Sequence, residues 1–186
     1  MRTCEKLLHG HAKFKAALAL TALAILATLP VAAPASTGGI GSSSSHARAG
    51  KARLVHGKAI APSNAPRRVV RVIAAANRIA KHKDYCYGGG HASFKSSCYD
   101  CSGSVSYALH GGRFLESPLP SGPMESWGLE GEGRWITVYA NPGHAYAVIA
   151  GFRWDTSGDS GGETGPRWHE DLRDNVGYVA RHPAGF

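Results

Sequence analysis

Two stretches of the chain space their apolar residues three or four positions apart, which is the period of a helix buried on one face. The first stretch follows Pro66 and contains Val69, Val70, Ile73, Ala76 and Ala80. Ser63 or Asn64 is placed to cap this helix, and Pro66 suits its first turn. The second stretch runs through Cys101, Val105, Ala108 and Leu109 and ends at Gly111-Gly112. We therefore expect two helices.

After residue 133 the pattern changes to short apolar runs, which are typical of strands. These runs cover residues 135–139, 144–149 and 152–155, with Ala150-Gly151 as a two-residue turn between the last two. Two fainter segments, at Trp168 and at 176–179, indicate a last strand region. Residues 116–133 are rich in Gly, Pro and Ser. We expect helices in the first half of the domain and strands in the second.

The first 35 residues have the layout of a secretory signal peptide. Residues 1–15 are polar and basic, residues 16–29 are almost wholly apolar, and Ala33-Pro34-Ala35 offers small residues at cleavage spacing. The apolar core is shorter than the ~20 residues of a membrane-spanning helix. We expect an exported protein, secreted or held in the cell wall or periplasm, with no stable membrane span after cleavage. The alternative is an uncleaved anchor that extends through Ala35.

Residues 36–66 are rich in Gly, Ser, Ala and Pro, so we expect a flexible linker before a domain at 67–186. The 186-residue chain carries a net charge of +8, but its charge is uneven. Up to Arg68, ten Lys and Arg face one acid, whereas the remainder has eleven against twelve. The leader and linker are thus the basic part, which argues against nucleic-acid binding by the domain. The linker is either a plain spacer or a contact for anionic wall polymers.

The segment with the clearest chemistry is 99–103, where Cys101 stands between Asp100 and Ser102 at the predicted start of a helix. A helix N-terminus carries partial positive charge and unpaired N–H groups, which favour an ionised thiol and offer donors to an oxyanion. Cys101 is therefore a candidate nucleophile. His144 opens a buried strand, which gives a general base a rigid platform.

Other histidines have simpler interpretations. His110 is expected to cap the end of the Cys101 helix. His91, after three glycines, is expected to be structural, and the alternative is that it lines the loop near the site. His169 and His182 have the polar or proline neighbours of surface residues.

Removal of the leader takes away Cys4 and leaves Cys86, Cys98 and Cys101, an odd number for an exported protein. A Cys86–Cys98 disulfide would leave Cys101 free. Two alternatives are a Cys98–Cys101 redox pair and a zinc site. The zinc ligands would be Cys86, His91, Cys98 and Cys101. Neither alternative explains Asp100, Ser102 and the helix that follows them, so we expect the disulfide, with no metal and no cofactor.

Three motifs together carry a family resemblance. They are Tyr85-x-Tyr87-Gly88-Gly89, Asp100-Cys101-Ser102-Gly103 and Gly143-His144 with its apolar strand. From about residue 70 onward, the chain resembles the NlpC-type cysteine peptidases, which are bacterial cell-wall endopeptidases with a reduced papain-like fold. The resemblance implies an α+β fold, in which N-terminal helices, one of them carrying the catalytic Cys, pack on an antiparallel β-sheet.

The resemblance also implies an activity. Cys101 would attack an amide carbonyl, and His144 would transfer the proton while a thioester forms. Such enzymes hydrolyse peptidoglycan stem peptides, most often between D-glutamate, through its γ-carboxyl, and a diamino acid. They recognise a free α-amino group through the acid and hydroxyl of the motif, here Asp100 and Ser102, with Tyr85 shaping the adjoining pocket. We expect a monomer. The alternatives are a CHAP-like N-acetylmuramoyl-L-alanine amidase and a catalytically idle wall-binding module.

Asp155 is the candidate for the residue that orients His144. A two-residue turn at Ala150-Gly151 pairs Ile149 with Phe152 and, by extension, Tyr146 with Asp155. Because side chains alternate along strands, His144 and Asp155 then share one sheet face. The alternative is that Asp155 only caps the turn that follows it.

Overall fold

The structure is a computed structural model, and it describes residues 48–158 and 164–186. The predicted signal peptide, Cys4 and residues 36–47 of the predicted linker lie outside these residues. The helices are α1 (Arg67–Ile79), α2 (Cys101–Gly111) and α3 (Ser121–Met124). The strands are β1 (Arg53–Val55), β2 (Lys58–Ile60), β3 (Leu129–Glu130), β4 (Ile136–Asn141), β5 (His144–Ile149), β6 (Phe152–Asp155), β7 (Arg167–His169) and β8 (Val179–His182).

Six of these strands form one antiparallel sheet in the order β3-β8-β4-β5-β6-β7. The turn between β5 and β6 has positive φ at Ala150 (47°) and Gly151 (82°), which matches the twist of a two-residue hairpin. The register pairs Ile149 with Phe152 and Ala147 with Trp154. The predicted hairpin is thus confirmed, and with it the shared face of His144 and Asp155.

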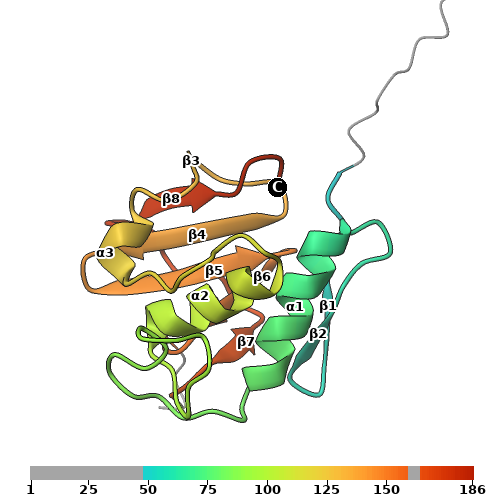
Figure 1. Ribbon diagram of the computed structural model, residues 1–186. Coiled ribbons are helices and arrows are strands. Elements are labelled where there is room, and N and C mark those ends of the chain that lie inside the picture. Colours follow the sequence, from blue (N-terminus) through green and yellow to red (C-terminus); the bar gives the residue numbers. More distant parts are fainter. Residues whose placement is uncertain (1–47, 159–163) are drawn as a thin grey trace, which may run out of the picture. The chain divides into compact units, whose positions relative to one another are not determined.

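Helices α1 and α2 pack against each other, and α2 also contacts β5 and β6 (Figure 1). The two helices meet at Gly111, where a Cβ atom would lie 2.3 Å from Ala75 Cβ, so a larger residue would separate them. Trp154 of β6 is fully buried, and its indole N–H donates to Ser104 O at 3.2 Å. This bond fixes the sheet to the first turn of α2, the turn that begins with Cys101.

The start of α1 differs from the expected cap. Pro66 occupies the cap position and makes no side-chain cap hydrogen bond. Asn64 instead donates its side-chain amide to Arg48 O at 3.1 Å. Of the apolar residues that predicted this helix, Val70 is 41% exposed, while Val69 and Ile73 are buried. The register of the buried face continues through Val72, Ala75 and Ile79.

The predicted flexible linker is wrong for residues 48–66. β1 and β2 form a two-stranded antiparallel hairpin there, and Ala52 and Ala59 are buried in the core. Asn77 of α1 holds β2 by accepting from Ala59 N at 2.9 Å and donating to Ala59 O at 2.7 Å. The low content of large apolar residues hid this hairpin, because small alanines and backbone hydrogen bonds supply its contacts.

The last two strands lie close to the predicted region, but β8 begins only at Val179, after 176–178. His169 of β7 is 6% exposed, so its interpretation as a surface residue is wrong. β7 pairs with β6, and this pairing places His169 within the sheet although Glu170 and Asp171 follow it in the sequence.

The α+β fold class is confirmed, with the cysteine-bearing helix packed on an antiparallel sheet. Within the part of the chain that the structure describes, no helix is long and apolar enough to cross a membrane.

Candidate active site

Cys101 is the first residue of α2, as the sequence predicts. Asp100 is the N-cap, and its Oδ1 accepts from Gly103 N at 2.7 Å, which satisfies one of the N–H groups that a helix start leaves unpaired. Cys101 is a free cysteine with 7% exposure. The fold therefore holds a nearly buried thiol against the positive end of a helix.

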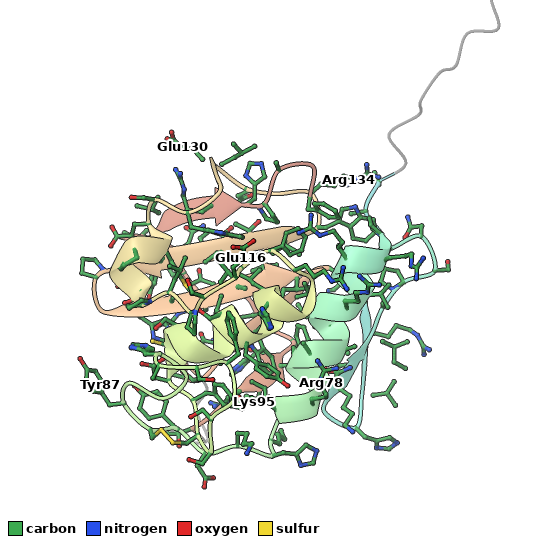
Figure 2. The ribbon with its side chains drawn as sticks, viewed as in Figure 1. Arg78, Tyr87, Lys95, Glu116, Glu130 and Arg134 are labelled. Atoms are coloured by element: carbon green, nitrogen blue, oxygen red, sulfur yellow. A yellow bond between two sulfur atoms is a disulfide. The ribbon has the colours of Figure 1, made fainter. Side chains whose placement is uncertain are left out.

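A glycine-rich loop packs against this helix start. Gly89 O accepts from Asp100 N at 3.1 Å, and a Cβ atom on Gly103 would lie 2.0 Å from the same oxygen. Only glycine fits Gly103's position, so the motif's last residue allows the loop and helix to touch. The loop is closed by a Cys86–Cys98 disulfide, which is visible in Figure 2.

His144 and Asp155 are in direct contact. His144 Nε2 lies 2.9 Å from Asp155 Oδ1, and the Asp155 side chain is fully buried. Asp155 also caps the following turn, since Oδ1 accepts from Thr156 N at 2.7 Å. The two interpretations of Asp155 from the sequence are therefore compatible, because one carboxylate makes both sets of contacts.

Two arginines that sequence reasoning missed bind the other oxygen of Asp155. Arg153 Nη1 and Arg173 Nη1 lie 2.8 Å and 2.9 Å from Oδ2. Arg153 is fully buried, and its remaining donors reach Ser157 O, Gly158 O and the backbone and side chain of Asp171. The available signal was the Arg153-x-Asp155 spacing, because alternate residues of a strand share a face.

The charges around this pair set its protonation. Burial acts to raise the pKa of Asp155, but His144 and Arg173 outweigh it and lower the pKa to about 2. Burial likewise acts to lower the pKa of His144, but Asp155 and the Cys101 thiol raise it to about 9 through hydrogen bonds and charge. Asp155 therefore accepts the Nε2 proton at neutral pH, and Nδ1 is the ring nitrogen left for Cys101. Arg173 Nη1, 3.1 Å from His144 Nε2, is then a neighbouring donor and not a hydrogen-bond partner of that atom.

Cys101 lies at a cleft of about 410 Å³. The cleft is lined by Tyr85, Tyr87, His91, Asp100, Cys101, Ser102, Pro120, Ser121, Gly122, Pro123, Pro142 and Gly143. The structure thus brings the predicted substrate residues Tyr85, Asp100 and Ser102 together around Cys101. Tyr87, 95% exposed, projects outward from the loop (Figure 2). Asp155 is fully buried and is not one of the residues that line the cleft.

His91 also lines this cleft, which favours the alternative of a place near the site over the expected structural role. Its Nε2 lies 2.8 Å from Asp100 Oδ2 and 2.9 Å from Ser102 Oγ. A second His–Asp pair therefore adjoins Cys101. Its position after three glycines was the available signal, because such a loop is able to approach a helix N-terminus closely.

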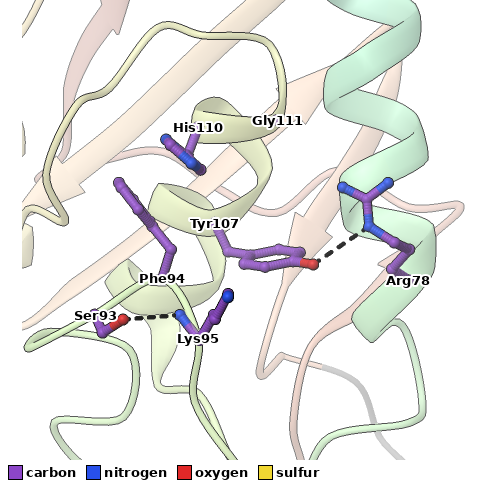
Figure 3. Close-up of a pocket in the computed structure, with 7 residues that line it drawn as sticks. All are labelled: Arg78, Ser93, Phe94, Lys95, Tyr107, His110 and Gly111. Carbon is purple, nitrogen blue, oxygen red and sulfur yellow. Dashed lines mark hydrogen bonds between the residues drawn. The ribbon is translucent and has the colours of Figure 1, made fainter.

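A different cavity, of about 330 Å³, lies at the other end of α2 (Figure 3). There His110 stacks on Phe94 with ring centroids 3.8 Å apart, and Arg78 Nε donates to Tyr107 OH at 3.3 Å. His110 Nδ1 lies 2.9 Å from Leu115 O, beyond the helix, so the predicted capping role is wrong. This cavity contains none of the residues around Cys101.

The zinc alternative fails on geometry. In residues 48–158 and 164–186, no group of three or more His, Cys, Asp or Glu side chains is arranged to hold a metal ion. Cys86 and Cys98 are joined to each other.

No protein-family model matches the sequence, and no curated protein matches it. Solved structures that match include two of the resuscitation promoting factor interacting protein RipA, one mutated at a histidine and one at a glutamate. The first has a TM-score of 0.46 and 19% identity, and the match covers 71% of each chain. The second has a TM-score of 0.45 and 20% identity, covering 73% of this chain and 69% of that one.

A hypothetical invasion protein of Mycobacterium tuberculosis also matches, with a TM-score of 0.45 and 19% identity. That match covers 70% of this chain and 71% of the other.

Proposed function

We propose that this chain is an exported cysteine peptidase that hydrolyses peptidoglycan stem peptides. The observation that carries the proposal is the arrangement around Cys101. A free thiol begins a helix, and His144, whose pKa is raised by Asp155 and by Cys101, is held by a buried Asp155. Nucleophile, base and orienting carboxylate in this relation are the elements of a thiol hydrolase.

The proposed reaction begins with attack by the Cys101 thiolate on an amide carbonyl. His144, as an imidazolium, then donates its Nδ1 proton to the leaving amine, and a thioester remains on Cys101. Water, deprotonated by His144 Nδ1, hydrolyses the thioester to release the acid and regenerate the thiol. Asp155 keeps Nε2 protonated throughout and stabilises the imidazolium.

The developing oxyanion has a donor in place. The backbone N–H of Cys101 is among the first four of α2, which have no acceptor within their own helix. Asp100 already binds the N–H of Gly103, two residues further on, and Cys101 itself lines the cleft. A donor fixed by a helix needs no reorganisation as charge develops.

The substrate proposal rests on the resemblance to NlpC-type enzymes and on the cleft. We propose cleavage of the bond between the γ-carboxyl of D-glutamate and a diamino acid, with Tyr85, Asp100 and Ser102 contacting the stem peptide. A cleft of about 410 Å³ is large enough for a few residues of an extended peptide. The disulfide supports an oxidising compartment, in keeping with export. A monomer, with a basic N-terminal part able to contact anionic wall polymers, remains part of this proposal.

The test is digestion of purified peptidoglycan by the wild-type chain and by Cys101→Ala, with fragments identified by mass spectrometry. New amino ends on the diamino acid, absent with Cys101→Ala, are the expected result. Release of intact stems from muramic acid would assign an amidase, and absence of fragments would favour a wall-binding module.

A further inference from the structure

His91 contacts both groups that the resemblance assigns to a substrate's amino end. Its Nε2 reaches Asp100 Oδ2 at 2.8 Å and Ser102 Oγ at 2.9 Å. Asp100 and Ser102 are 3% and 1% exposed, whereas the His91 side chain is 32% exposed. Of these three side chains, His91 is the most exposed and therefore the most accessible to a ligand in the cleft.

The carboxylate of Asp100 is surrounded by four polar groups, three of which donate hydrogen bonds to it. An ionised carboxylate accepts about four hydrogen bonds. On Oδ1, Asp100 accepts from Gly103 N at 2.7 Å and Ser102 Oγ at 3.2 Å. On Oδ2, it accepts from Gly88 N at 3.1 Å, and His91 Nε2 lies 2.8 Å from the same oxygen as an ion-pair contact. The three hydrogen-bond donors belong to the helix start and the loop packed on it, so the His91 side chain is the neighbour that can be replaced without disturbing the backbone.

Ser102 is occupied in the same way. Its hydroxyl donates to Asp100 Oδ1 and lies where it accepts the Nε2 proton of His91. An ammonium group has three donors and no acceptor, so it needs free oxygen lone pairs. To bind here, a free amino end would first have to displace His91 from both oxygens.

We propose that His91 sets the specificity of this subsite, turning it away from a free α-amino group and toward stem peptides whose amino end is acylated. An acylated amino end carries no charge, so it does not need a carboxylate as a binding partner. The surrounding lining suits such a group, since Tyr85, Pro120 and Pro123 offer apolar surface beside the imidazole. In peptidoglycan, the acylated form is the stem that is still joined to the glycan.

This inference rests on the proposed function, and a binding measurement tests the inference separately from the hydrolytic activity. Two synthetic peptides are needed, L-Ala-γ-D-Glu-diaminopimelate with a free amino end and its N-acetyl form. Their dissociation constants are measured by calorimetry on the full chain carrying Cys101→Ala, so that no turnover interferes. The same measurement is made with His91→Ala and with His91→Gln added. Glutamine keeps a side-chain N–H donor of similar reach and is the matched control.

With His91 in place, we expect the acetylated peptide to bind tighter by roughly 10- to 100-fold, the scale of a hydrogen bond to a charged group. His91→Ala should reverse this order, and His91→Gln should retain it. Equal or tighter binding of the free amine with His91 present would overturn the inference, as would failure of both peptides to bind. Turnover of the same peptides by the wild-type chain tests the proposed hydrolase activity separately. Binding of the acetylated peptide without any cleavage would refute the hydrolase and leave the role of His91 supported.

Discussion

Two His–Asp pairs accompany Cys101 in this site. They differ in the groups that bind the carboxylate of each pair. In the Asp155–His144 pair, the carboxylate is fully buried and bound by Arg153 and Arg173. In the Asp100–His91 pair, the carboxylate is bound by backbone N–H groups and by Ser102. The His–Asp distances, 2.9 Å and 2.8 Å, are nearly the same.

The comparison teaches that a His–Asp hydrogen bond does not by itself make a catalytic base. Asp155 has neighbouring cations that keep it ionised, and its carboxylate, together with Cys101, raises the pKa of His144 to about 9. Asp100 instead uses its oxygens to cap α2 and to hold the glycine-rich loop. We therefore propose that the Asp155–His144 pair serves proton transfer and that the Asp100–His91 pair serves helix capping and recognition.

The largest difference between the pairs should appear on removal of each imidazole. We expect His144→Ala to lower kcat/KM on peptidoglycan fragments by about 10⁴-fold or more, as loss of a general base does in thiol and serine hydrolases. His91→Ala should instead alter the preference between peptides and stay far more active than His144→Ala. Steady-state kinetics on both peptides measures this, with melting temperatures as the folding control. Equal losses from the two substitutions would abolish the distinction.

The next effect concerns the carboxylate that orients the base. We expect Asp155→Asn to lower kcat by roughly 10²- to 10³-fold, because the amide no longer stabilises an imidazolium. The wild-type activity should fall as pH rises through about 9, where His144 loses its proton. Without the charge of Asp155 that fall should move to lower pH. An unchanged alkaline limb in Asp155→Asn would show that Asp155 does not act on His144.

The same pair makes stability depend on pH, with opposite signs for its members. The raised pKa of His144 contributes stability that is fully present below its ordinary pKa of 6.5 and is lost as pH rises through about 9. The lowered pKa of Asp155 contributes stability that is present above 3.8 and is lost as pH falls through about 2. Urea unfolding across this range, with Asp155→Asn as the reference, should show both losses diminished in the variant.

The loop that carries His91 offers a further test. Joint replacement of Cys86 and Cys98 by serine should lower the free energy of unfolding by about 2 to 3 kcal/mol, because the disulfide closes a short loop. Denaturant unfolding of the oxidised protein measures this loss. Because the loop packs on Asp100 and not on Asp155, its loosening should affect peptide preference more than the pH profile. A shift of the alkaline limb without a change of preference would contradict this division.

The smallest effect belongs to Arg173, whose side chain is 27% exposed. Arg173→Ala should lower kcat by about tenfold or less, because solvent screens the lost charge and Arg153 still neutralises Asp155. Arg173→Lys should restore part of the loss, since a cation can remain near Oδ2. Arg173 also lies over the rings of Tyr146 and Tyr178, so its role could be packing. A shift of the pH dependence of activity in Arg173→Ala would indicate the electrostatic role on Asp155. An unchanged profile in Arg173→Ala would leave packing as its role.

The sequence predicted the parts of this site whose positions follow from local patterns. Helical spacing and the motif placed Cys101 at a helix start, and a two-residue turn fixed the register that brings Asp155 to the face of His144. Arg173 could not be found in this way, because it reaches Asp155 from a loop 18 residues further along the chain. A place for His91 near the site was only the alternative for a similar reason, since its contact with Asp100 depends on how a glycine-rich loop folds back. The β1–β2 hairpin was missed because its composition is that of a linker.

The central claim is that Cys101 and His144 form one coupled proton-transfer pair, and the NMR titration of the His144 ring tests it most directly. In the wild-type chain, with the resonance assigned from His144→Gln, we expect a pKa of about 9. In Cys101→Ala the pKa should be lower than in the wild-type chain but still raised, because the contribution of Cys101 is gone while that of Asp155 remains. An unchanged pKa in this variant would contradict the claim, as would a titration near 6.5 in both proteins.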